Sequence, residues 1–302
     1  MTAPSNYLAE TFRTGSIAIV GRPNVGKSTL LNQIIGQKVS ITSRKAQTTR
    51  HRIAGVLTEA DTQYIFLDTP GYQKTHQNAL NKLLNRTVSQ TLEEADVVVM
   101  VVESLLFDER DEAVLKLLPD GRPVVLVVSK VDRVKDKTRL LPFLKTMATR
   151  FKFAAVVPVS AKQRHQLDAL KQVVREYLPH SPALFDADDF TDRSERFLAA
   201  DFIREKIFRY LGDELPYSVS VVIESFEEEG NLRRINAAII VEKDSQKAIL
   251  IGKGGERLKQ IGTEARLDLE KLYGARIYLE LWVRIKKGWA DDEKLVRQYG
   301  YE

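Results

Sequence analysis

The stretch Gly21-Arg22-Pro23-Asn24-Val25-Gly26-Lys27-Ser28 decides the fold, because it fits the pattern G-x-x-x-x-G-K-[ST] of a phosphate-binding loop. Its glycines let the backbone wrap around phosphates, so that amide hydrogens and the positive end of the following helix face the anion. We expect Lys27 to reach the β- and γ-phosphates and Ser28 to bind Mg²⁺. An apolar strand pattern at Ser16–Val20 precedes the loop and a helix pattern at Ser28–Ile35 follows it, as the motif requires.

Three later motifs each stand at the end of a predicted strand. Asp68-Thr69-Pro70-Gly71 offers a second acid for Mg²⁺ and the backbone amide of Gly71 for the γ-phosphate. Ser129-Lys130-Val131-Asp132 offers the Asp132 carboxylate to guanine N1 and the exocyclic amine, a donor pair that adenine lacks. Ser160-Ala161-Lys162 offers backbone amides to guanine O6. Because the carboxyl ends of parallel strands meet at one edge, we predict a single GTP/GDP site.

Catalysis needs groups beyond these motifs. A threonine in Gln47-Thr48-Thr49-Arg50 could complete the Mg²⁺ shell when the γ-phosphate is present, and we favour Thr49 over Thr48. Loss of the γ-phosphate would release this loop, which makes a switch. Tyr72 stands where a Ras-type enzyme carries a glutamine that orients the attacking water, so hydrolysis should be slow unless assisted.

Assistance could come from the phosphate loop itself. In related GTPases with an apolar residue after the second motif, an asparagine at the position of Asn24 helps to hold a K⁺ ion in place of an arginine finger. Activation of GTP hydrolysis by potassium is therefore a hypothesis. The predicted catalytic residues are Asn24, Lys27, Thr49 and Gly71. The predicted metal ligands are Ser28, Thr49 and Asp68. Tyr72 is also expected to contact the nucleotide, together with the residues of the four motifs.

The first part of the chain alternates strand and helix patterns, which predicts an α/β, Ras-like P-loop domain with a mixed, mostly parallel sheet. An antiparallel strand pair is expected at Arg52–Thr58 and Thr62–Leu67. Further strands are expected at Val97–Val102, Pro123–Val128 and Ala154–Val159, and helices at about 78–94, 108–118, 138–150 and 166–178.

The second part has the order α-β-β-α-α-β. A helix capped by Thr191 or Ser194 should run to Leu211, with strands at Ser218–Phe226 and Arg234–Val241 joined by an acidic turn at Glu227–Gly230. Next come a short helix at Ser245–Ile251, the loop Gly252-Lys253-Gly254-Gly255, a long helix to Tyr273 and a strand at Arg276–Ile285.

The loop between these two helices fits the pattern G-x-x-G. Such a loop lets a nucleic-acid backbone approach closely, although a simple helix–helix turn has the same pattern.

Composition narrows the classes of function. The chain has 302 residues, a net charge of +5 and no cysteine, which excludes disulfides and thiolate metal sites. Residues 252–287 are locally basic, with nine basic and five acidic side chains. No apolar stretch approaches the ~18 residues of a membrane span, so we expect a cytoplasmic protein without a transmembrane segment.

The motifs together resemble those of the bacterial Era GTPases, a Ras-like GTPase domain followed by a type II KH domain. Ser40–His51 resembles the family's first switch, and Leu215–Ser218 and Gly288–Glu293 resemble its KH-side signatures. Two prolines in Pro179-His180-Ser181-Pro182 and the acidic residues that follow predict a linker at 181–191. We therefore expect an N-terminal extension at 1–15, a GTPase domain at 16–180 and a KH domain with its tail at 192–302. The family normally has asparagine where this chain has Ser129, which should weaken nucleotide binding while Asp132 keeps the guanine preference.

The resemblance also implies partners and an RNA site. It implies binding of the 3′ end of 16S rRNA, help in assembling the 30S ribosomal subunit, peripheral contact with the inner membrane and a monomer. The expected RNA-binding residues are Ile251, Gly252, Lys253, Gly254, Gly255, Arg257 and Lys259, with Ile249, Leu258 and Ile261 as groove wall or core. The alternative functions are an RNA-binding adaptor whose nucleotide is structural and, less well supported, a tRNA-modifying GTPase.

Overall fold

The computed structural model describes residues 11–43, 48–73, 79–211 and 219–299. Residues 1–10 of the expected extension, 44–47 of the expected first switch, 212–218 with the Leu215–Ser218 signature, 74–78 and 300–302 lie outside the described residues. The chain forms two compact units. The first takes Met1–Ser40, His51–Gln73 and Asn85–Asp192, and the second takes Ile41–Arg50, Lys74–Leu84 and Arg193–Glu302.

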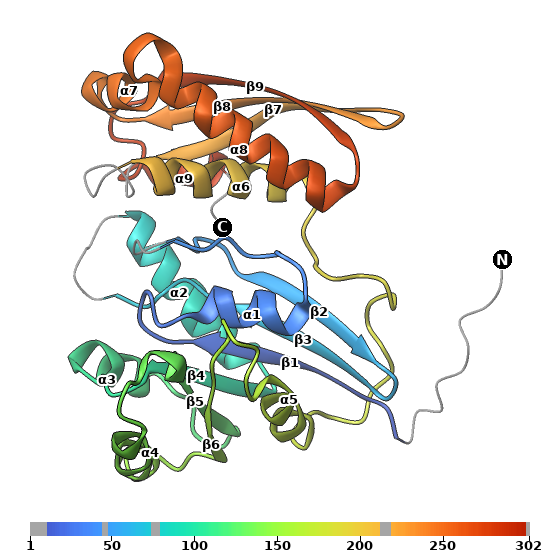
Figure 1. The fold of residues 1–302 in the computed structure, drawn as a ribbon, viewed down its shortest axis with the longest axis vertical. Helices are drawn as coiled ribbons and strands as arrows, with labels where there is room; N and C mark the ends of the chain where they lie inside the picture. Colours follow the sequence, from blue (N-terminus) through green and yellow to red (C-terminus); the bar gives the residue numbers. More distant parts are fainter. Residues whose placement is uncertain (1–10, 44–47, 74–78, 212–218, 300–302) are drawn as a thin grey trace, which may run out of the picture. The chain divides into compact units, whose positions relative to one another are not determined.

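The first unit is built on a six-stranded sheet in the order β2-β3-β1-β4-β5-β6 (Figure 1). Only the β2–β3 pair is antiparallel, and the other neighbours are parallel. This confirms the predicted mixed, mostly parallel sheet. The strands are β1 (Arg13–Val20), β2 (Ile53–Glu59), β3 (Thr62–Asp68), β4 (Val97–Glu103), β5 (Val124–Ser129) and β6 (Ala155–Pro158). β1 begins three residues before the expected strand, since Arg13–Gly15 pair with β3.

Helices cover both faces of this sheet because its strands are apolar on both sides. Alternate residues of β4 enter two different cores: Val99 packs with α1 (Lys27–Ile35) and α5 (Leu167–Arg175). Met100 packs on the opposite face with α2 (Ala79–Glu94), α3 (Glu109–Leu115) and α4 (Leu140–Ala148). A strand buried on both faces reads as a continuous apolar run, which is what the sequence shows at 97–102.

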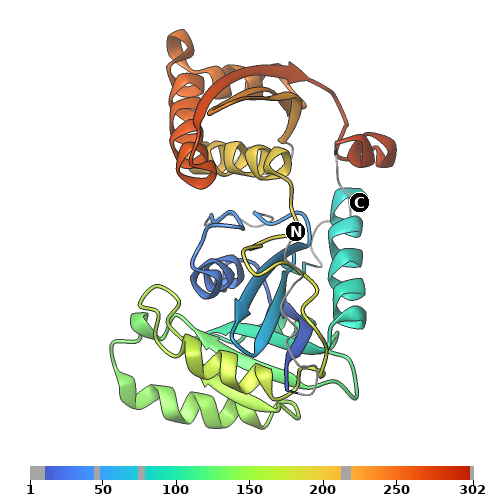
Figure 2. The same cartoon turned by 90° about the vertical axis from the view of Figure 1, so that its right-hand side faces the viewer.

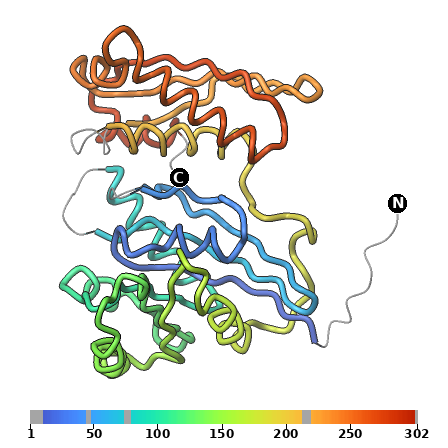
Figure 3. Tube along the Cα trace, in the orientation of Figure 1, coloured from blue at the N-terminus to red at the C-terminus, as the bar shows by residue number. Residues whose placement is uncertain are grey.

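The segment after α5 belongs to the first unit and runs beside β2, as the trace in Figure 3 shows. The Val56 amide donates to the Phe190 carbonyl at 3.0 Å, and the Thr191 hydroxyl donates to the Ala54 carbonyl at 2.8 Å. Gln63 accepts from the Leu184 amide at 2.7 Å. The stretch expected as a linker is therefore fastened to the sheet by hydrogen bonds.

The second unit pairs three strands in the order β7-β8-β9, with β7–β8 antiparallel and β8–β9 parallel. Helices α6 and α8 pack on one face of the sheet (Figure 2). The elements are α6 (Glu195–Tyr210), β7 (Ser220–Glu229), β8 (Leu232–Val241), α7 (Asp244–Ile251), α8 (Glu256–Tyr273), β9 (Arg276–Ile285) and α9 (Glu293–Gln298). The order up to β9 is that of the expected KH domain, and Ser194 is the residue that caps α6.

Two details differ from the sequence-based expectation. The acidic stretch expected as a turn lies in β7, because Glu227 pairs in register with Arg234 and Glu228 with Arg233. Opposite charges on facing strands stabilise such an extension. The helix α9 was not expected, although Asp292 caps it by accepting from the Lys294 and Leu295 amides. Its six residues give too short a periodic pattern to be recognised.

The cores predict which substitutions destabilise the first unit. Ile17 is fully buried between strands and helices, so Ile17→Ala should lower the free energy of unfolding by roughly 2–5 kcal/mol. Leu184→Ala removes a side chain that is 68% exposed and should change it by less than about 0.5 kcal/mol. Urea denaturation followed by circular dichroism measures both, and equal effects would contradict the packing described here.

Candidate functional site

The phosphate-binding loop follows the carboxyl end of β1, and its first residue, Gly21, has no room for a side chain. A Cβ on Gly21 would lie 2.5 Å from the Val101 carbonyl oxygen, so glycine is required there. Gly26 has φ 110° and is the N-cap of α1. Asn24 is exposed with φ 66°, a left-handed conformation that asparagine tolerates better than most residues. Backbone geometry alone therefore explains an asparagine at this position.

Lys27 lies inside this loop. Its side chain is buried, and Nζ donates to the Gly21 carbonyl at 2.9 Å and to the Arg22 carbonyl at 3.1 Å. Burial lowers the pKa of Lys27 to about 8, and the nearby Asp68 charge opposes this shift. A buried ammonium surrounded by loop carbonyls is held where an anion enclosed by the loop would neutralise it.

Three oxygen-bearing side chains meet at the end of β3. The hydroxyls of Ser28 and Ser40 both donate to Oδ2 of Asp68, at 2.7 Å and 2.8 Å. Hard oxygen ligands with one carboxylate, completed by phosphate and water, are what Mg²⁺ prefers, so the residues fit this ion. Ser28 and Asp68 were predicted here, and Ser40 was not. Asn32 places it by accepting from the Val39 and Ser40 amides, each at 2.9 Å.

The Asp-Thr-Pro-Gly motif approaches the phosphate loop closely. A Cβ on Gly71 would lie 2.8–2.9 Å from atoms of Pro23, so only glycine fits beside the loop. The Thr69 hydroxyl donates to the Ile19 carbonyl at 2.8 Å and ties the motif to β1. The next residue, Tyr72, packs partly buried against the apolar core under α2 and α3. Its side chain therefore serves packing.

The base-recognition motifs follow β5 and β6. The Ser160 hydroxyl donates to Oδ1 of Asp132 at 2.7 Å and fixes the direction of that carboxylate. Lys130 donates to the Asn24 carbonyl at 2.6 Å and to Glu103 at 2.7 Å, which joins this motif to the phosphate loop. Val131 is buried, Ala161 is half-buried and Lys162 is exposed. Positions in both motifs thus converge on one end of the sheet.

Ser129 keeps one function that a longer amide side chain would have. Its hydroxyl lies 2.6 Å from the Val25 carbonyl and 2.9 Å from the Val102 carbonyl, so it links the phosphate loop to β4. The side chain is buried and both contacts are to the protein. The serine thus braces the loop, and no second polar group remains for a base.

A buried ion pair that the sequence did not suggest also fixes the loop. Arg22 Nε lies 3.0 Å from Asp111 Oδ2, and Asp111 is fully buried in α3. Burial raises the pKa of Asp111, while the Asp108 amide and the Arg22 charge oppose this shift. The pair joins two segments 89 residues apart, so no local pattern could have indicated it.

The switch threonines belong to the second unit. Arg204 of α6 donates to the Thr48 carbonyl at 2.7 Å, and Arg50 donates to the Val219 carbonyl at 2.8 Å. The Thr42 amide donates to Glu205 at 3.0 Å. Thr48 and Thr49 are both buried in this unit. Residues 41–43 and 48–50 are therefore held by α6 and by Val219 before β7.

The G-x-x-G loop opens to solvent between α7 and α8. Gly252 has φ 73°, and a Cβ there would lie 2.8 Å from Arg257 Cβ. Gly254 (φ 61°) and Gly255 (φ 82°) also need left-handed backbone, and a Cβ on either would meet nothing within 4 Å. This open, left-handed turn ends at the first residue of an 18-residue helix. A backbone phosphate could therefore approach the loop directly.

The remaining predicted RNA-binding residues divide by exposure. Lys253 and Lys259 are exposed. Arg257 donates to the Ile249 carbonyl at 2.8 Å, so it also fastens the end of α7. Ile249, Ile251 and Leu258 are half-buried against the unit's core, whereas Ile261 is fully buried and is core.

Comparison with known proteins agrees with this geometry. A family model described as a 50S ribosome-binding GTPase matches residues 16–130, and a KH domain model matches residues 214–290. GTPase Era of Nitrosomonas eutropha is 56% identical over 97% of this chain and 99% of its own length. GTPase Era of Neisseria meningitidis serogroup A is 53% identical over 97% and 96%. This chain belongs to the GTPase Era family.

Solved Era structures share the whole fold. A substituted Aquifex aeolicus Era bound to GDP and AlF₄⁻ has a TM-score of 0.92 and 38% identity, covering 96% of this chain and 99% of its own. An Era structure in complex with MgGDPNP and nucleotides 1506–1542 of 16S ribosomal RNA gives the same values. The family and fold class expected from the sequence are both confirmed.

The Arg22–Asp111 pair predicts a selective loss. Asp111→Ala leaves the buried Arg22 guanidinium with only the longer contact to Glu103 at 3.8 Å and should cost roughly 3–5 kcal/mol of stability, with faster release of GDP. The neighbouring Glu112→Ala removes an exposed ion pair with Arg150 at 3.5 Å and should cost less than about 1 kcal/mol. Thermal unfolding and stopped-flow GDP release measure the two variants, and similar behaviour would refute a bracing role.

Ser129 gives a second prediction. Ser129→Ala removes the one hydroxyl donor shared between these two carbonyls, worth about 0.5–1.5 kcal/mol, so GDP affinity should fall by up to roughly tenfold. Ser129→Asn should not weaken GDP binding, because its amide can brace the loop and reach the base. Fluorescent-nucleotide titration decides this, and unchanged affinity of the alanine variant would show that the brace is dispensable.

Proposed function

We propose that this chain is a GTP-hydrolysing switch that binds the 3′ end of 16S rRNA and assists assembly of the 30S ribosomal subunit. One observation carries the nucleotide part: Asp132, oriented by Ser160, lies at the same sheet edge as the phosphate loop and the Ser28–Asp68 pair. The relatives that cover nearly the whole chain support the RNA part, because one Era structure is in complex with 16S rRNA nucleotides.

In this proposal each segment handles one part of the nucleotide. The loop amides and Lys27 hold the phosphates, while Ser28 and Asp68 hold Mg²⁺, which neutralises charge on the β- and γ-phosphates when bound. Asp132 accepts from the guanine N1 and amine. Gly71 presents its amide toward the γ-phosphate, because its position beside Pro23 brings the backbone close to the loop.

Hydrolysis in this account is slow without assistance. Tyr72 packs into the core, so the water must be oriented by other groups. Thr49 would complete the Mg²⁺ shell in the GTP state, with Thr48 as the alternative. Asn24 would help to hold K⁺, although its left-handed backbone is a sufficient reason for asparagine on its own.

Chain continuity supports a link between the nucleotide and the RNA-binding unit. Ser40 donates to Asp68 in the first unit, and Thr42, two residues later, donates to Glu205 in the second. A γ-phosphate that draws Thr49 to Mg²⁺ would act on the residue next to Thr48, whose carbonyl accepts from Arg204 of α6. Nucleotide state would thus act on the helix that begins the KH unit.

The RNA site in this proposal is centred on Gly252–Gly255. The open turn lets a phosphate reach the backbone amides, and the exposed Lys253 and Lys259 add positive charge. The groove wall is formed by the half-buried Ile251 and Leu258. We further propose a cytoplasmic monomer with peripheral inner-membrane contact. In the described ranges, no helix combines the length and apolarity needed to span a bilayer.

The competing function is an RNA-binding adaptor with a nucleotide bound for structure. The packing of Tyr72 and the serine at position 129 favour it, because both depart from groups that assist catalysis or base binding. Slow hydrolysis that rises with RNA distinguishes the switch from the adaptor.

The G-x-x-G loop predicts separable losses. Gly254→Asp places a carboxylate where a phosphate should approach, so affinity for an RNA of nucleotides 1506–1542 should fall at least tenfold while GTP affinity stays unchanged. Gly121→Asp is the matched control, since Gly121 is also left-handed (φ 81°) with open space. Fluorescence anisotropy measures RNA binding, and equal RNA affinity of the two variants would refute the site.

Potassium activation gives a further prediction. If Asn24 helps to hold K⁺, phosphate release from GTP should be at least several-fold faster in KCl than in NaCl at equal ionic strength. Asn24→Gly keeps the left-handed backbone and should abolish the difference. Equal turnover of the unchanged protein in the two salts would refute the hypothesis.

A further inference from the structure

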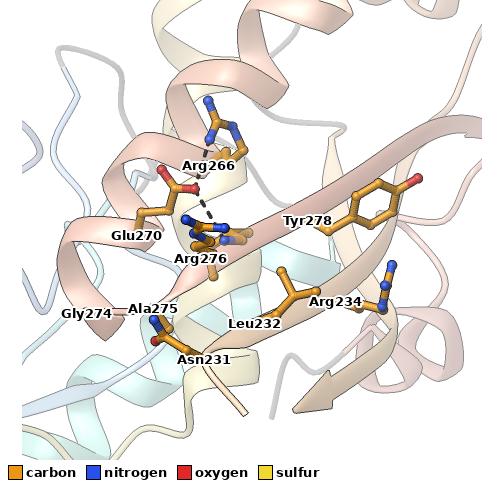
Figure 4. A pocket seen from close by; sticks show the side chains of 10 residues that line it. Asn231, Leu232, Arg234, Arg266, Glu270, Gly274, Ala275, Arg276 and Tyr278 are labelled. Carbon is orange, nitrogen blue, oxygen red and sulfur yellow. Dashed lines mark hydrogen bonds and ion pairs between the residues drawn. The ribbon is translucent and has the colours of Figure 1, made fainter. Parts of the chain in front are cut away.

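A cavity of about 800 Å³ lies in the second unit where α8 turns into β9 (Figure 4). Its lining includes Arg234, Arg266, Arg276 and Tyr278, with Glu270 as the one acidic residue. The cavity is shallow and open to solvent, and its area is enough to contact a nucleotide-sized group lying on the surface. The excess of arginine makes its walls complementary to phosphate.

Three of these side chains share one face of the sheet. Arg234 of β8 and Tyr278 of β9 are direct partners in the parallel register, and Arg276 stands two residues before Tyr278 on the same strand. The neighbouring Ile277 points the other way, into the core. The two arginines and the tyrosine therefore face away from the helix-covered side.

The tyrosine ring is arranged as a stacking surface. Tyr278 is 50% exposed although it lies in a strand. Arg234 lies with its guanidinium carbon 5.5 Å from the ring centroid, and Glu229 holds that guanidinium at 3.0 Å. An exposed aromatic ring beside a fixed arginine is the arrangement that stacks a nucleic-acid base.

The charge on the other wall is also arranged for an anion. Glu270 accepts from Arg266 at 2.8 Å and from the Ile277 amide at 3.3 Å, so the one carboxylate is already used. Arg266 is thereby positioned with part of its guanidinium still exposed. Within the described ranges, no ion pair or hydrogen bond engages the guanidinium of Arg276, which is exposed. Arg276 is thus available for a phosphate.

We propose that this cavity is a second RNA contact, in which Tyr278 stacks a base and Arg276 binds the adjoining phosphate. The inference rests on the proposed RNA binding and extends it. Gly255 and Gly274 flank α8, whose 18 residues make it about 27 Å long. A KH loop clamps four nucleotides. The cavity therefore engages nucleotides outside those four.

The test uses the full chain and a nested series of RNAs, from nucleotides 1506–1542 of 16S rRNA down to the shortest fragment that still binds. Fluorescence anisotropy at several salt concentrations gives the affinities. For the longest RNA, Arg276→Ala should weaken binding roughly tenfold and reduce the salt slope by about 0.7, the value for one single-strand phosphate contact. Tyr278→Ala should weaken it roughly tenfold, and Tyr278→Phe should bind as the unchanged chain does.

Two comparisons separate this contact from other causes. Lys294→Ala, which removes one exposed positive charge from α9, should leave affinity unchanged. The shortest binding fragment should be bound equally by Arg276→Ala and the unchanged chain, whereas Gly254→Asp should lose affinity for every length. Thermal unfolding checks that the variants fold.

The results that would overturn the cavity proposal differ from those that would overturn RNA binding as a whole. If Arg276→Ala and Tyr278→Ala bind every RNA as the unchanged chain does, while Gly254→Asp loses binding, the RNA function stands and the cavity is not part of it. An equal loss in Lys294→Ala would reduce the effect to bulk charge. If the unchanged chain binds no RNA in the series, the proposed function and this inference both fail.

Discussion

The buried carboxylate of Asp68 is the constraint on which the nucleotide site depends. It ends β3, and it accepts hydroxyl donors from two other segments, Ser28 at the start of α1 and Ser40 after it. A buried carboxylate is costly unless it is bonded or binds a cation, so these three segments must stay together. The phosphate loop, the end of β3 and the residue Ser40 are thereby joined to one another through a single carboxylate.

The same constraint explains how a local ligand can affect a distant part of the chain. The segment that leaves Ser40 continues directly into residues that belong to the other compact unit, where Ile41 is fully buried in the core and Arg50 and Arg204 bind backbone carbonyls. Since packed cores have discrete arrangements, a shift of the proposed switch toward Mg²⁺ would exchange one set of contacts for another. The continuous chain from Ser40 to Ile41 is enough to connect the nucleotide site with the second unit.

The features that could be predicted from the sequence are those that depend on residues close together in the chain. The four nucleotide motifs, the apolar strand runs and the G-x-x-G loop are short patterns that need few residues. In the structure the four motifs follow strands of one sheet, and the G-x-x-G loop lies between α7 and α8. Ser40 and the pair of Arg22 with Asp111 were missed because each depends on a partner far along the chain. The length of β7 was misjudged because its acidic end is stabilised only by arginines on β8.

Phosphate release from GTP, measured with and without RNA of nucleotides 1506–1542 in potassium buffer, tests the central claim most directly. Because Tyr72 supplies no water-orienting group, the account predicts slow release by the protein alone and faster release when the RNA is bound. No release in either condition, with GTP shown to be bound, would contradict a hydrolysing switch and favour the adaptor.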